Sequence, residues 1–359
     1  MYRVKVLHII TGLNTGGAEM MLYKICKYKS ENVEYKVISL TTKGPIASKL
    51  ERLGIEVDSA NFSKSPRSIL SFFKLLNTIK QYNPDLIQSW MYHSDLVSSI
   101  ISLILRKPLF WNIRQASVNT KLNKKLTVFV AKLCGKLSFV PLRIISCTKK
   151  GISEHSLIGY KKKKMIFIPN GFEISEFTIN KRPNQYRKLI HVGRYAPLKN
   201  HSSFLRISQM ILVKIPNLKI EMYGDGINGQ NLELVSLASE LGILKNIDFK
   251  GRSNNLRDIY AQSDLLISTS FSEGFPNTIG EAMCCGCSVI TTNAGDSADI
   301  VLDEKNIFLP DQNEEMAIRA VEILQGNINR EENRELITSR FDISKTVTQY
   351  EILYLNKTL

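Results

Sequence analysis

The sequence lacks an apolar segment long enough to cross a membrane. Its best candidate, Val97–Leu105, is much shorter than the roughly 20 residues that a spanning helix needs, and Arg106 and Lys107 follow it directly. A signal peptide is also missing, because VKVLHIITGL at the N-terminus has the pattern of a strand that leads into a glycine turn. These absences predict a cytoplasmic protein.

The sequence also lacks a paired cysteine framework. Its six cysteines include a CxxC motif at Cys284 and Cys287, but no second pair and no histidine lies near that motif. Zinc or redox sites usually need such partners, so the spacing favours free thiols buried in the core of a cytosolic protein.

Acidic residues are scarce in the first half of the chain. Residues 1–182 contain 30 Lys and Arg against 11 Asp and Glu, whereas residues 183–359 contain 18 against 22. A basic half and a slightly acidic half indicate two units with different partners. The basic unit should face something anionic, for which nucleic acid, a lipid head-group surface and a phosphate-bearing substrate are all candidates.

Short β-branched strands alternate with helical patterns throughout the chain. In the first half the expected strands include VKVLHII, YKVISL, DLIQSW, LFWNIR, RIISCT and MIFIPN, and the second half restarts with KLIHVGR, LKIEMYG, IDFKG, LLISTS and SVITT. Alternating strands and helices predict parallel, doubly wound sheets, and two such runs predict two Rossmann-like α/β domains.

The expected domain boundary lies within Phe177–Lys188, where Pro183 and Asn184 interrupt the periodicity. We therefore expect an N-terminal domain at 1–180 and a C-terminal domain at 181–340. A final helix at 341–359 is expected to pack back on the N-terminal domain.

The first motif follows the first strand. In TGLNTGGAE, Gly16 and Gly17 open a helix, and backbone N–H groups at such a helix start can approach an anion. The spacing does not match the dinucleotide pattern GxGxxG. From these residues alone, a plain tight turn and a phosphate-binding loop both remain open.

The second motif, GRYAPLKN, places Arg194 and Lys199 on one strand-to-helix loop. A guanidinium and an ammonium five residues apart could clamp a diphosphate and neutralise a leaving group. Two solvated, unpaired cations on a surface loop are the alternative.

The third motif, SEGFPNTIGEAM, carries the strongest signal. Glu273 ends a loop, Glu281 lies in the first turns of a helix after Pro276, and the segment Gly274–Thr278 offers backbone amides at the start of that helix. Carboxylates accept hydrogen bonds from pairs of hydroxyls such as ribose and hexose carry. A helix with a surface glutamate at each end explains the glycine and the proline less well.

Together, TGLNTGGAE, VGRYAPLKN, YGDG and SEGFPNTIGEAM resemble family 4 of the retaining glycosyltransferases, in the same order and over nearly the whole chain. The resemblance implies the GT-B fold, in which two Rossmann-like domains face each other across a cleft. It also implies that the domain at 1–180 binds the acceptor and the domain at 181–340 binds the nucleotide sugar. Three segments depart from the usual pattern: Ser288 in place of a common proline, AGDSADIV, and Asn254 with Asn255.

The resemblance also implies roles for individual residues. Glu281 would hold the ribose, Glu273 the donor sugar near its O3, and Arg194 and Lys199 the diphosphate. His93 in QSWMYHSD would contact the donor sugar, whereas a lone histidine beside aromatics is otherwise more often structural. The implied catalytic residues are His93, Arg194, Lys199 and Glu273; the implied donor-binding residues are Gly16, Gly17, Arg194, Lys199, Gly224, Glu273, Gly274, Phe275, Pro276, Asn277, Thr278 and Glu281.

The expected reaction is metal-independent transfer of a hexose or N-acetylhexosamine, with retention, from a UDP-linked donor to a lipid-linked saccharide of the O-antigen or capsule type. No cofactor is expected. Asp95 is the only carboxylate near His93 in the sequence, and it has no clear claim to be a nucleophile, which favours same-face attack.

Three alternatives to this function remain. The first is a different GT-B activity, such as a nucleotide-sugar epimerase, a glycogen-type synthase or a transferase with a soluble acceptor. The second is an inactive scaffold, and the third is a basic nucleic-acid-binding protein. The last has only charge in its favour.

A basic amphipathic segment suggests where the protein meets its acceptor. In LNKKLTVFVAKLCGKLSFVPLR, the side chains of Leu126, Phe129, Val130, Leu133 and Leu137 recur at helical spacing among lysines. Such a helix can lie in an anionic interface, or it can pack on its own sheet with the lysines outward. The charge of this half favours a peripheral location on the inner face of the cell membrane, to which Lys161–Lys164 would add.

Overall fold

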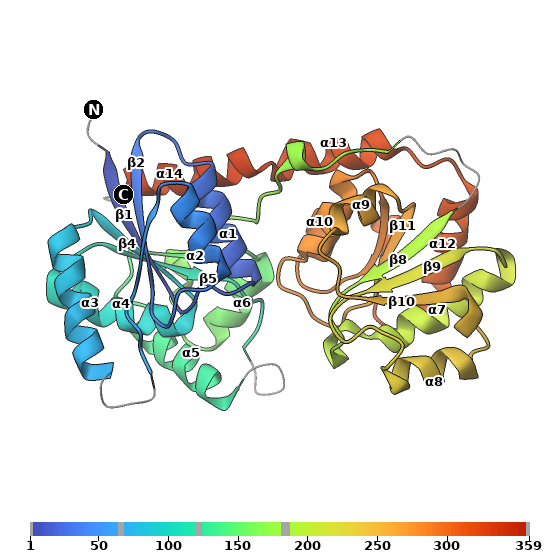
Figure 1. The fold of residues 1–359 in the computed structure, drawn as a ribbon, viewed down its shortest axis with the longest axis horizontal. Coiled ribbons are helices and arrows are strands. Elements are labelled where there is room, and N and C mark those ends of the chain that lie inside the picture. Colours follow the sequence, from blue (N-terminus) through green and yellow to red (C-terminus); the bar gives the residue numbers. More distant parts are fainter. Residues whose placement is uncertain (1–2, 64–67, 119–123, 181–186, 357–359) are drawn as a thin grey trace. The chain divides into compact units, whose positions relative to one another are not determined.

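The computed structural model describes residues 3–63, 68–118, 124–180 and 187–356, and it divides the chain into two compact units (Figure 1). The first unit comprises Met1–Gly171 and Ile343–Leu359, and the second comprises Phe172–Asp342. The expected boundary after residue 180 lies inside the second unit. Residues just after Gly171 are tied to that unit because Arg334 donates hydrogen bonds to the carbonyl oxygens of Phe177 (2.8 Å) and Ile174 (3.0 Å).

The first unit is built around a parallel sheet whose described strands have the order β3-β2-β1-β4-β5-β6-β7. The strands are β1 (Val4–Ile10), β2 (Val33–Ser39), β3 (Glu56–Ser59), β4 (Leu86–Trp90), β5 (Leu109–Ile113), β6 (Arg143–Ser146) and β7 (Met165–Phe167). The helices are α1 (Gly17–Lys27), α2 (Pro45–Arg52), α3 (Ser68–Tyr82), α4 (Tyr92–Leu105), α5 (Lys125–Leu137), α6 (Lys149–Leu157) and α14 (Ile343–Leu355).

The order of the strands explains how the helices cover this sheet. The chain winds outward from β1 to β3 through α1 and α2, and then returns to β4 and continues to β7 through α3, α4, α5 and α6. Right-handed crossovers put these two groups of helices on opposite faces of the sheet. Both faces are therefore buried, which is why β4 and β5 consist entirely of buried residues.

The C-terminal helix α14 belongs to the first unit. The side chains of Tyr350 and Tyr354 are fully buried, and Asn112 on β5 donates a 2.8 Å hydrogen bond to the hydroxyl of Tyr350. The backbone N–H of Ser30 donates to the carboxylate of Glu351 at 2.7 Å. Buried aromatic rings and polar links of this kind fix α14 against the helix α1 and the strand β1.

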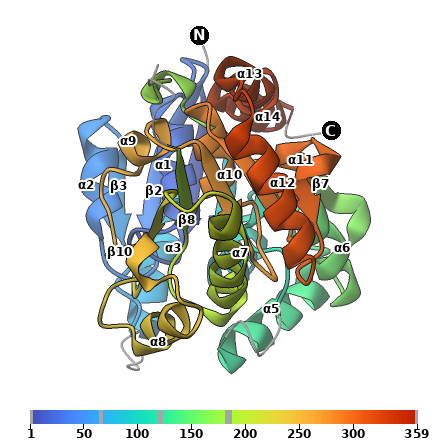
Figure 2. The ribbon, with the colours of Figure 1, turned by 90° about the vertical axis from the view of Figure 1, so that its right-hand side faces the viewer.

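The second unit repeats the architecture, with a described strand order of β10-β9-β8-β11-β12-β13 and parallel pairing throughout. Its strands are β8 (Lys188–Val192), β9 (Lys219–Tyr223), β10 (Ile247–Gly251), β11 (Leu265–Ser268), β12 (Ser288–Thr292) and β13 (Ile307–Phe308). Its helices are α7 (His201–Lys214), α8 (Leu232–Glu240), α9 (Leu256–Ala261), α10 (Asn277–Cys284), α11 (Ser297–Val301), α12 (Asn313–Gln325) and α13 (Arg330–Phe341), and α7 packs against α12 (Figure 2).

The prediction of two doubly wound α/β domains is confirmed, but two edge strands were missed. The strand β3 has the sequence EVDS, in which only Val57 carries an apolar signal, and β13 has only two residues. An edge strand pairs on one side alone, so it needs little of the β-branched pattern on which sequence analysis depends. All six cysteines are buried free thiols, as expected.

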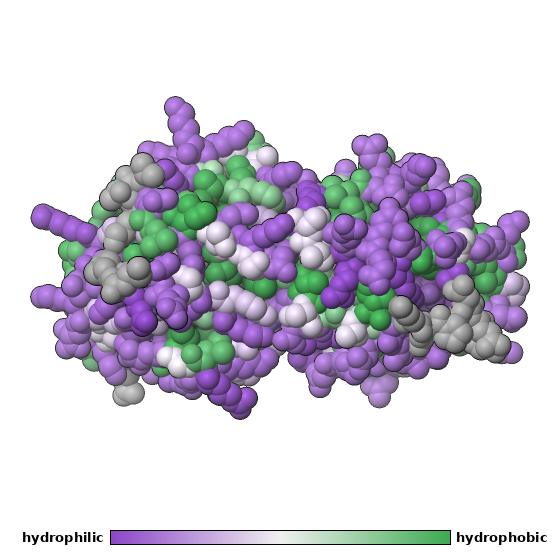
Figure 3. Space-filling model, turned by 90° about the horizontal axis from the view of Figure 1, so that it is seen from above, coloured by the Kyte–Doolittle hydropathy of each residue, from purple (hydrophilic) through white to green (hydrophobic). Residues whose placement is uncertain are grey.

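Several large hydrophobic side chains are exposed on the surface of the protein. Among the described residues, no helix is both long and apolar enough to cross a bilayer. On the face drawn in Figure 3, hydrophobic residues lie in small groups between hydrophilic ones.

The amphipathic helix α5 is divided between core and surface. Of the five apolar side chains at helical spacing, Val130 packs with Ala131 and Cys134 into the core of the first unit, as the alternative of a helix packed on its own domain requires. In contrast, Leu126 is 65% exposed and Phe129 is 63% exposed. The helix thus packs on its own domain and still leaves apolar side chains in solvent.

Candidate active site

In the second unit, the predicted donor-binding residues gather where β8 and β11 lie side by side. The strand order changes direction there, since β8 leads to β9 on one side and β11 to β12 on the other. The loops that follow two such strands diverge and leave a crevice at their carboxyl ends, where doubly wound sheets bind ligands. Lys199 follows β8 and Glu273 follows β11.

The structure brings Lys199 and Glu273 into direct contact. The Lys199 ammonium forms an ion pair and hydrogen bond with Oε1 of Glu273. The two side chains are 21% and 13% exposed, so both are mostly shielded from water. A shielded pair is screened less than a surface pair, and it provides a positive and a negative group within one site.

Two hydroxyl groups that the sequence analysis missed fix this pair. Ser270 donates a 2.7 Å hydrogen bond to Oε1 of Glu273. The Thr269 hydroxyl lies 3.1 Å from the carbonyl oxygen of Lys199 and 2.9 Å from that of Asn200, which ties the lysine loop to the end of β11. The serine three residues before Glu273 was the only sequence signal that could have revealed this link.

Gly224 holds the neighbouring loops close together. Its φ of 149° lies in the region that favours glycine, and a Cβ at this position would lie 2.0 Å from the carbonyl oxygen of Gly193. Tyr195 donates its backbone N–H to the carbonyl oxygen of Asp225 at 2.7 Å. Gly224 therefore supports the backbone beside Arg194, whose side chain is exposed and makes no ion pair within the described part of the chain.

The segment from Gly274 to Thr278 leads into α10, which begins at Asn277. Gly295 lies so close that a Cβ there would be 2.4 Å from the carbonyl oxygens of Glu273 and Gly274. Phe275 and Pro276 are buried, and Phe275 packs its ring against Phe172 and Phe341. These contacts hold the segment at the start of α10, where backbone N–H groups are unpaired within the helix.

Glu281 lies one turn into α10 and is partly exposed. Burial raises the pKa of the Tyr260 hydroxyl well above its usual value, and the nearby negative charge of Glu281 raises it further. The carboxylate therefore lies beside α9, one turn along the helix from the Gly274–Thr278 segment.

In the first unit, the remaining predicted residues lie at the corresponding position between β1 and β4, which are also paired neighbours. Thr11 after β1 and Ser94 in the first turn of α4 share a hydrogen bond of 3.0 Å between their hydroxyls. The loop that carries Gly16 and Gly17 therefore starts beside the helix start that carries His93.

The backbone before His93 is strained. Met91 has a φ of 74° and a ψ of 157°, an unusual conformation for a residue with a side chain, and its N–H donates to the carbonyl oxygen of Asn112 at 3.1 Å. The imidazole of His93 is half-buried and makes no hydrogen bond within the described residues, and burial lowers its pKa. His93 is thus a neutral ring at pH 7, placed at the carboxyl end of the sheet.

Asp95, two residues after His93, lies in the interior of the first unit and is not accessible to a ligand. Its carboxyl group is fully buried and accepts a 2.5 Å hydrogen bond from Ser89, and burial raises its pKa well above the usual value for aspartate. Burial thus favours the uncharged form of this carboxyl group, which lies in the interior of the unit.

The turn at Gly16 and Gly17 lies beside the carboxylate of Glu19, which the sequence motif did not indicate. Gly16 caps α1 in an extended conformation, and a Cβ there would lie 2.4 Å from the Glu19 carboxylate. Burial raises the pKa of Glu19. An acidic group at this helix start competes with an external anion for the same N–H groups.

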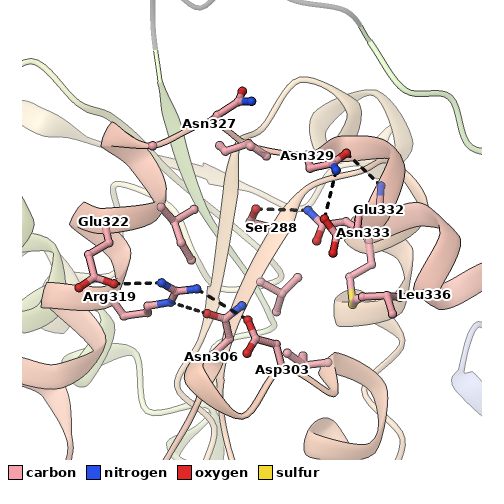
Figure 4. A pocket seen from close by; sticks show the side chains of 16 residues that line it. Ser288, Asp303, Asn306, Arg319, Glu322, Asn327, Asn329, Glu332, Asn333 and Leu336 are labelled. Carbon is pink, nitrogen blue, oxygen red and sulfur yellow. Dashed lines mark hydrogen bonds and ion pairs between the residues drawn. The ribbon is translucent and has the colours of Figure 1, made fainter.

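A separate cavity of about 360 Å³ opens on the second unit (Figure 4). It lies at the amino ends of β12 and β13, since Ser288 and Asn306 line it. Arg319 projects into it and is paired with Glu322 and Asp303. None of the predicted site residues lines this cavity, which is at the opposite end of the strands from Lys199 and Glu273.

Known proteins resemble both the sequence and the fold. Residues 173–338 match the sequence model of the family described as Glycosyl transferases group 1. The capsular polysaccharide biosynthesis glycosyltransferase CapH of Staphylococcus aureus is 27% identical over 99% of this chain and 100% of its own length. The crystal structure of Anabaena Alr3699/HepE in complex with UDP superimposes with a TM-score of 0.82, at 22% identity, over 97% of this chain and 99% of that one.

A third similar protein is named for its acceptor. It is the Campylobacter jejuni GalNAc-alpha-(1->4)-GalNAc-alpha-(1->3)-diNAcBac-PP-undecaprenol alpha-1,4-N-acetyl-D-galactosaminyltransferase, which is 24% identical over 88% of this chain and 87% of its own length. Two parallel-sheet α/β domains with this structural neighbour show the GT-B fold. The predicted resemblance is confirmed: residues 173–338, within the second unit, match a group 1 glycosyltransferase domain, and the relatives that span most of the chain support a family 4-like glycosyltransferase.

Proposed function

We propose that the protein is a retaining, metal-independent hexosyltransferase of surface polysaccharide assembly. Its donor would be a UDP-linked hexose or N-acetylhexosamine, and its acceptor a lipid-linked saccharide. The name of the Staphylococcus aureus relative supports a role in capsule synthesis, and that of the Campylobacter jejuni relative supports an undecaprenyl diphosphate acceptor. The Anabaena protein has been crystallised with UDP and with UDP-glucose, which supports the choice of nucleotide.

The contact between Lys199 and Glu273 at the carboxyl ends of β8 and β11 is the observation that carries this proposal. A nucleotide sugar combines an anionic diphosphate with a sugar rich in hydroxyls. Lys199 can bind the diphosphate, and Glu273 can accept hydrogen bonds from the sugar. Arg194, whose guanidinium is free of ion pairs among the described residues, would add a second cation, and Glu281 would bind the ribose.

The state of Asp95 supports same-face attack over a covalent intermediate. A nucleophilic carboxylate must be charged and accessible, whereas Asp95 is buried and has a raised pKa. In the proposed reaction, the bond from the anomeric carbon to the diphosphate breaks while the acceptor oxygen attacks on the same face. The departing diphosphate takes the proton of the acceptor hydroxyl, and Lys199 and Arg194 stabilise its charge.

We further propose that the protein binds the inner face of the cell membrane through its first unit. The helices α4 and α5 pack against each other, and both leave apolar side chains in solvent: Ile100, Leu103 and Ile104 on α4, and Leu126 and Phe129 on α5. Lys125, Lys132 and Lys136 lie on the same helix as the latter two. Apolar side chains among lysines suit an interface with anionic lipid.

The test of the proposed function is a screen of nucleotide sugars, with thermal stabilisation and release of UDP as readouts. UDP-glucose or UDP-N-acetylglucosamine at 100 times its dissociation constant should stabilise the protein by about 2.7 kcal/mol. Turnover should persist in EDTA, because Lys199 and Arg194 can neutralise the diphosphate. Salt-dependent binding of oligonucleotides without any response to nucleotide sugars would support the nucleic-acid alternative instead.

A further inference from the structure

Ser270 occupies an unusual place in the donor site. It follows the buried strand β11 and is itself only 1% exposed, while Phe271 beside it is 53% exposed. Its carbonyl oxygen accepts a 2.6 Å hydrogen bond from the Thr292 hydroxyl, and its own hydroxyl donates to Oε1 of Glu273 at 2.7 Å. The backbone of Ser270 is thus held against β12 by the Thr292 hydroxyl, and its side-chain hydroxyl holds the Glu273 carboxylate.

The two oxygens of Glu273 differ in what they bind. Oε1 accepts hydrogen bonds from both Lys199 and Ser270, whereas Oε2 is in no hydrogen bond or ion pair within the described part of the chain. The carboxylate is therefore anchored through one oxygen and has the other available for a ligand. Accepting several bonds at Oε1 is within the capacity of an ionised carboxylate.

A bound diphosphate would change this balance. It competes with Glu273 for the Lys199 ammonium, because both are anionic. The backbone of Lys199 would stay in place, since the Thr269 hydroxyl contacts its carbonyl oxygen and Phe271 donates its N–H to the carbonyl oxygen of Leu198 at 2.8 Å. When the ammonium turns to the diphosphate, Ser270 is the remaining contact that orients Oε1.

We propose that Ser270 is a positioning residue that keeps the Glu273 carboxylate aligned with the donor sugar once Lys199 binds the diphosphate. This inference rests on the proposed function and adds a residue to it. Alignment matters because a misplacement of about 1 Å in a catalytic site can cost on the order of 100-fold in rate. The serine would act on the sugar through Glu273 and leave binding of the nucleotide unchanged.

The experiment compares Ser270→Ala with Ser272→Ala as a matched control. Ser272 is two residues further along the same loop, and its hydroxyl makes no hydrogen bond within the described residues. Initial rates with UDP-glucose and UDP-N-acetylglucosamine give kcat and KM, and calorimetry gives the Kd for UDP alone. We expect kcat/KM to fall about tenfold in Ser270→Ala, with the Kd for UDP within twofold of the wild type. Ser272→Ala should match the wild type in both, and Ser270→Thr should recover part of the rate.

The outcomes separate the possible failures. Wild-type kcat/KM in a folded Ser270→Ala protein would overturn the inference, and so would an equal loss of affinity for UDP, which indicates general damage to the loop. Should the alanine variant not fold, Ser270→Cys gives the same comparison, because its thiol is a weak donor of similar size. If the wild type neither binds UDP nor turns over either sugar donor, the proposed function fails before the serine is tested.

Discussion

The two units carry different chemistry at the same topological position. At the junction of β8 and β11, the second unit holds a cation and a carboxylate in contact, Lys199 and Glu273, with hydroxyl groups behind them. At the junction of β1 and β4, the first unit holds a neutral histidine, His93, after a strained backbone. One fold thus places a pair of opposite charges at this position in the second unit and a neutral imidazole in the first, which agrees with the proposed binding of the diphosphate and of the sugar. Topology thus determines where such a site lies, and its side chains determine which ligand it can bind.

The largest effect should follow from removing the cation in the second unit. Lys199→Ala deletes the group proposed to stabilise the departing diphosphate, so kcat should fall by at least tenfold and on the order of 100-fold. Initial-rate kinetics and a melting curve measure both the loss and the fold. Lys214→Ala, at the exposed end of α7, is the control and should behave as the wild type. A folded Lys199→Ala protein with normal turnover would show that the Lys199 ammonium does not stabilise the departing diphosphate.

Acid should destabilise the two units alike. Burial lowers the pKa of His8 to about 3 and that of His155 to about 4 in the first unit, and lowers His191 to about 3 and His201 to about 4 in the second. Above pH 6.5 these rings are neutral in both the folded and the unfolded chain, so they contribute no pH dependence.

Below pH 6.5 the unfolded chain binds protons that the folded chain rejects, and the free energy of unfolding falls until the pH reaches the folded pKa values. Each of these histidines should lower the free energy of unfolding by about 2 kcal/mol at pH 5. Melting curves from pH 8 to pH 5 test this. In His155→Gln, the fall in the free energy of unfolding over this range should be smaller by the contribution of one histidine. A stability that stays constant down to pH 5 would contradict the buried, neutral state of these rings.

A moderate effect is expected at the neutral crevice of the first unit. His93→Ala should lower kcat about tenfold with an unchanged melting temperature, because the half-buried imidazole has no hydrogen bond to lose among the described residues. His155→Ala provides the contrast, since His155 is buried and lies 2.9 Å from the Tyr92 hydroxyl. It should lower the free energy of unfolding by about 1–3 kcal/mol. Equal loss of stability in both variants would make His93 a structural residue.

The smallest effect concerns the exposed side chains of α5. Replacing Leu126 and Phe129 together with serine should reduce, by a few-fold, the fraction of protein that sediments with anionic vesicles at low salt. Turnover of a soluble donor should stay the same, because these residues lie outside both crevices. Vesicles of neutral lipid and high salt are the controls. Wild-type protein that stays in the supernatant with anionic vesicles would end the membrane proposal and favour a soluble acceptor.

Much of the site could be predicted because its residues follow strands. Periodicity indicated where β1, β4, β8 and β11 end, and parallel strands put their carboxyl ends at one edge of each sheet. Gly16, His93, Lys199 and Glu273 lie at those ends in the structure. The helix α4 begins at Tyr92, so His93 lies in its first turn, a detail that the motif QSWMYHSD did not reveal.

The sequence by itself determined the two doubly wound domains, the glycosyltransferase family and the places of the charged residues, because strand periodicity and loop motifs are local properties. Only the tertiary structure decided which groups meet. The contacts of Lys199 with Glu273 and of Thr269 with Lys199 join residues about 70 positions apart, and no local pattern encodes such a distance. The same holds for Val130, whose burial depends on the neighbours that α5 packs against. Burial and pairing are properties of the assembled core, and they raise the pKa of Asp95 and determine the partners of Glu273.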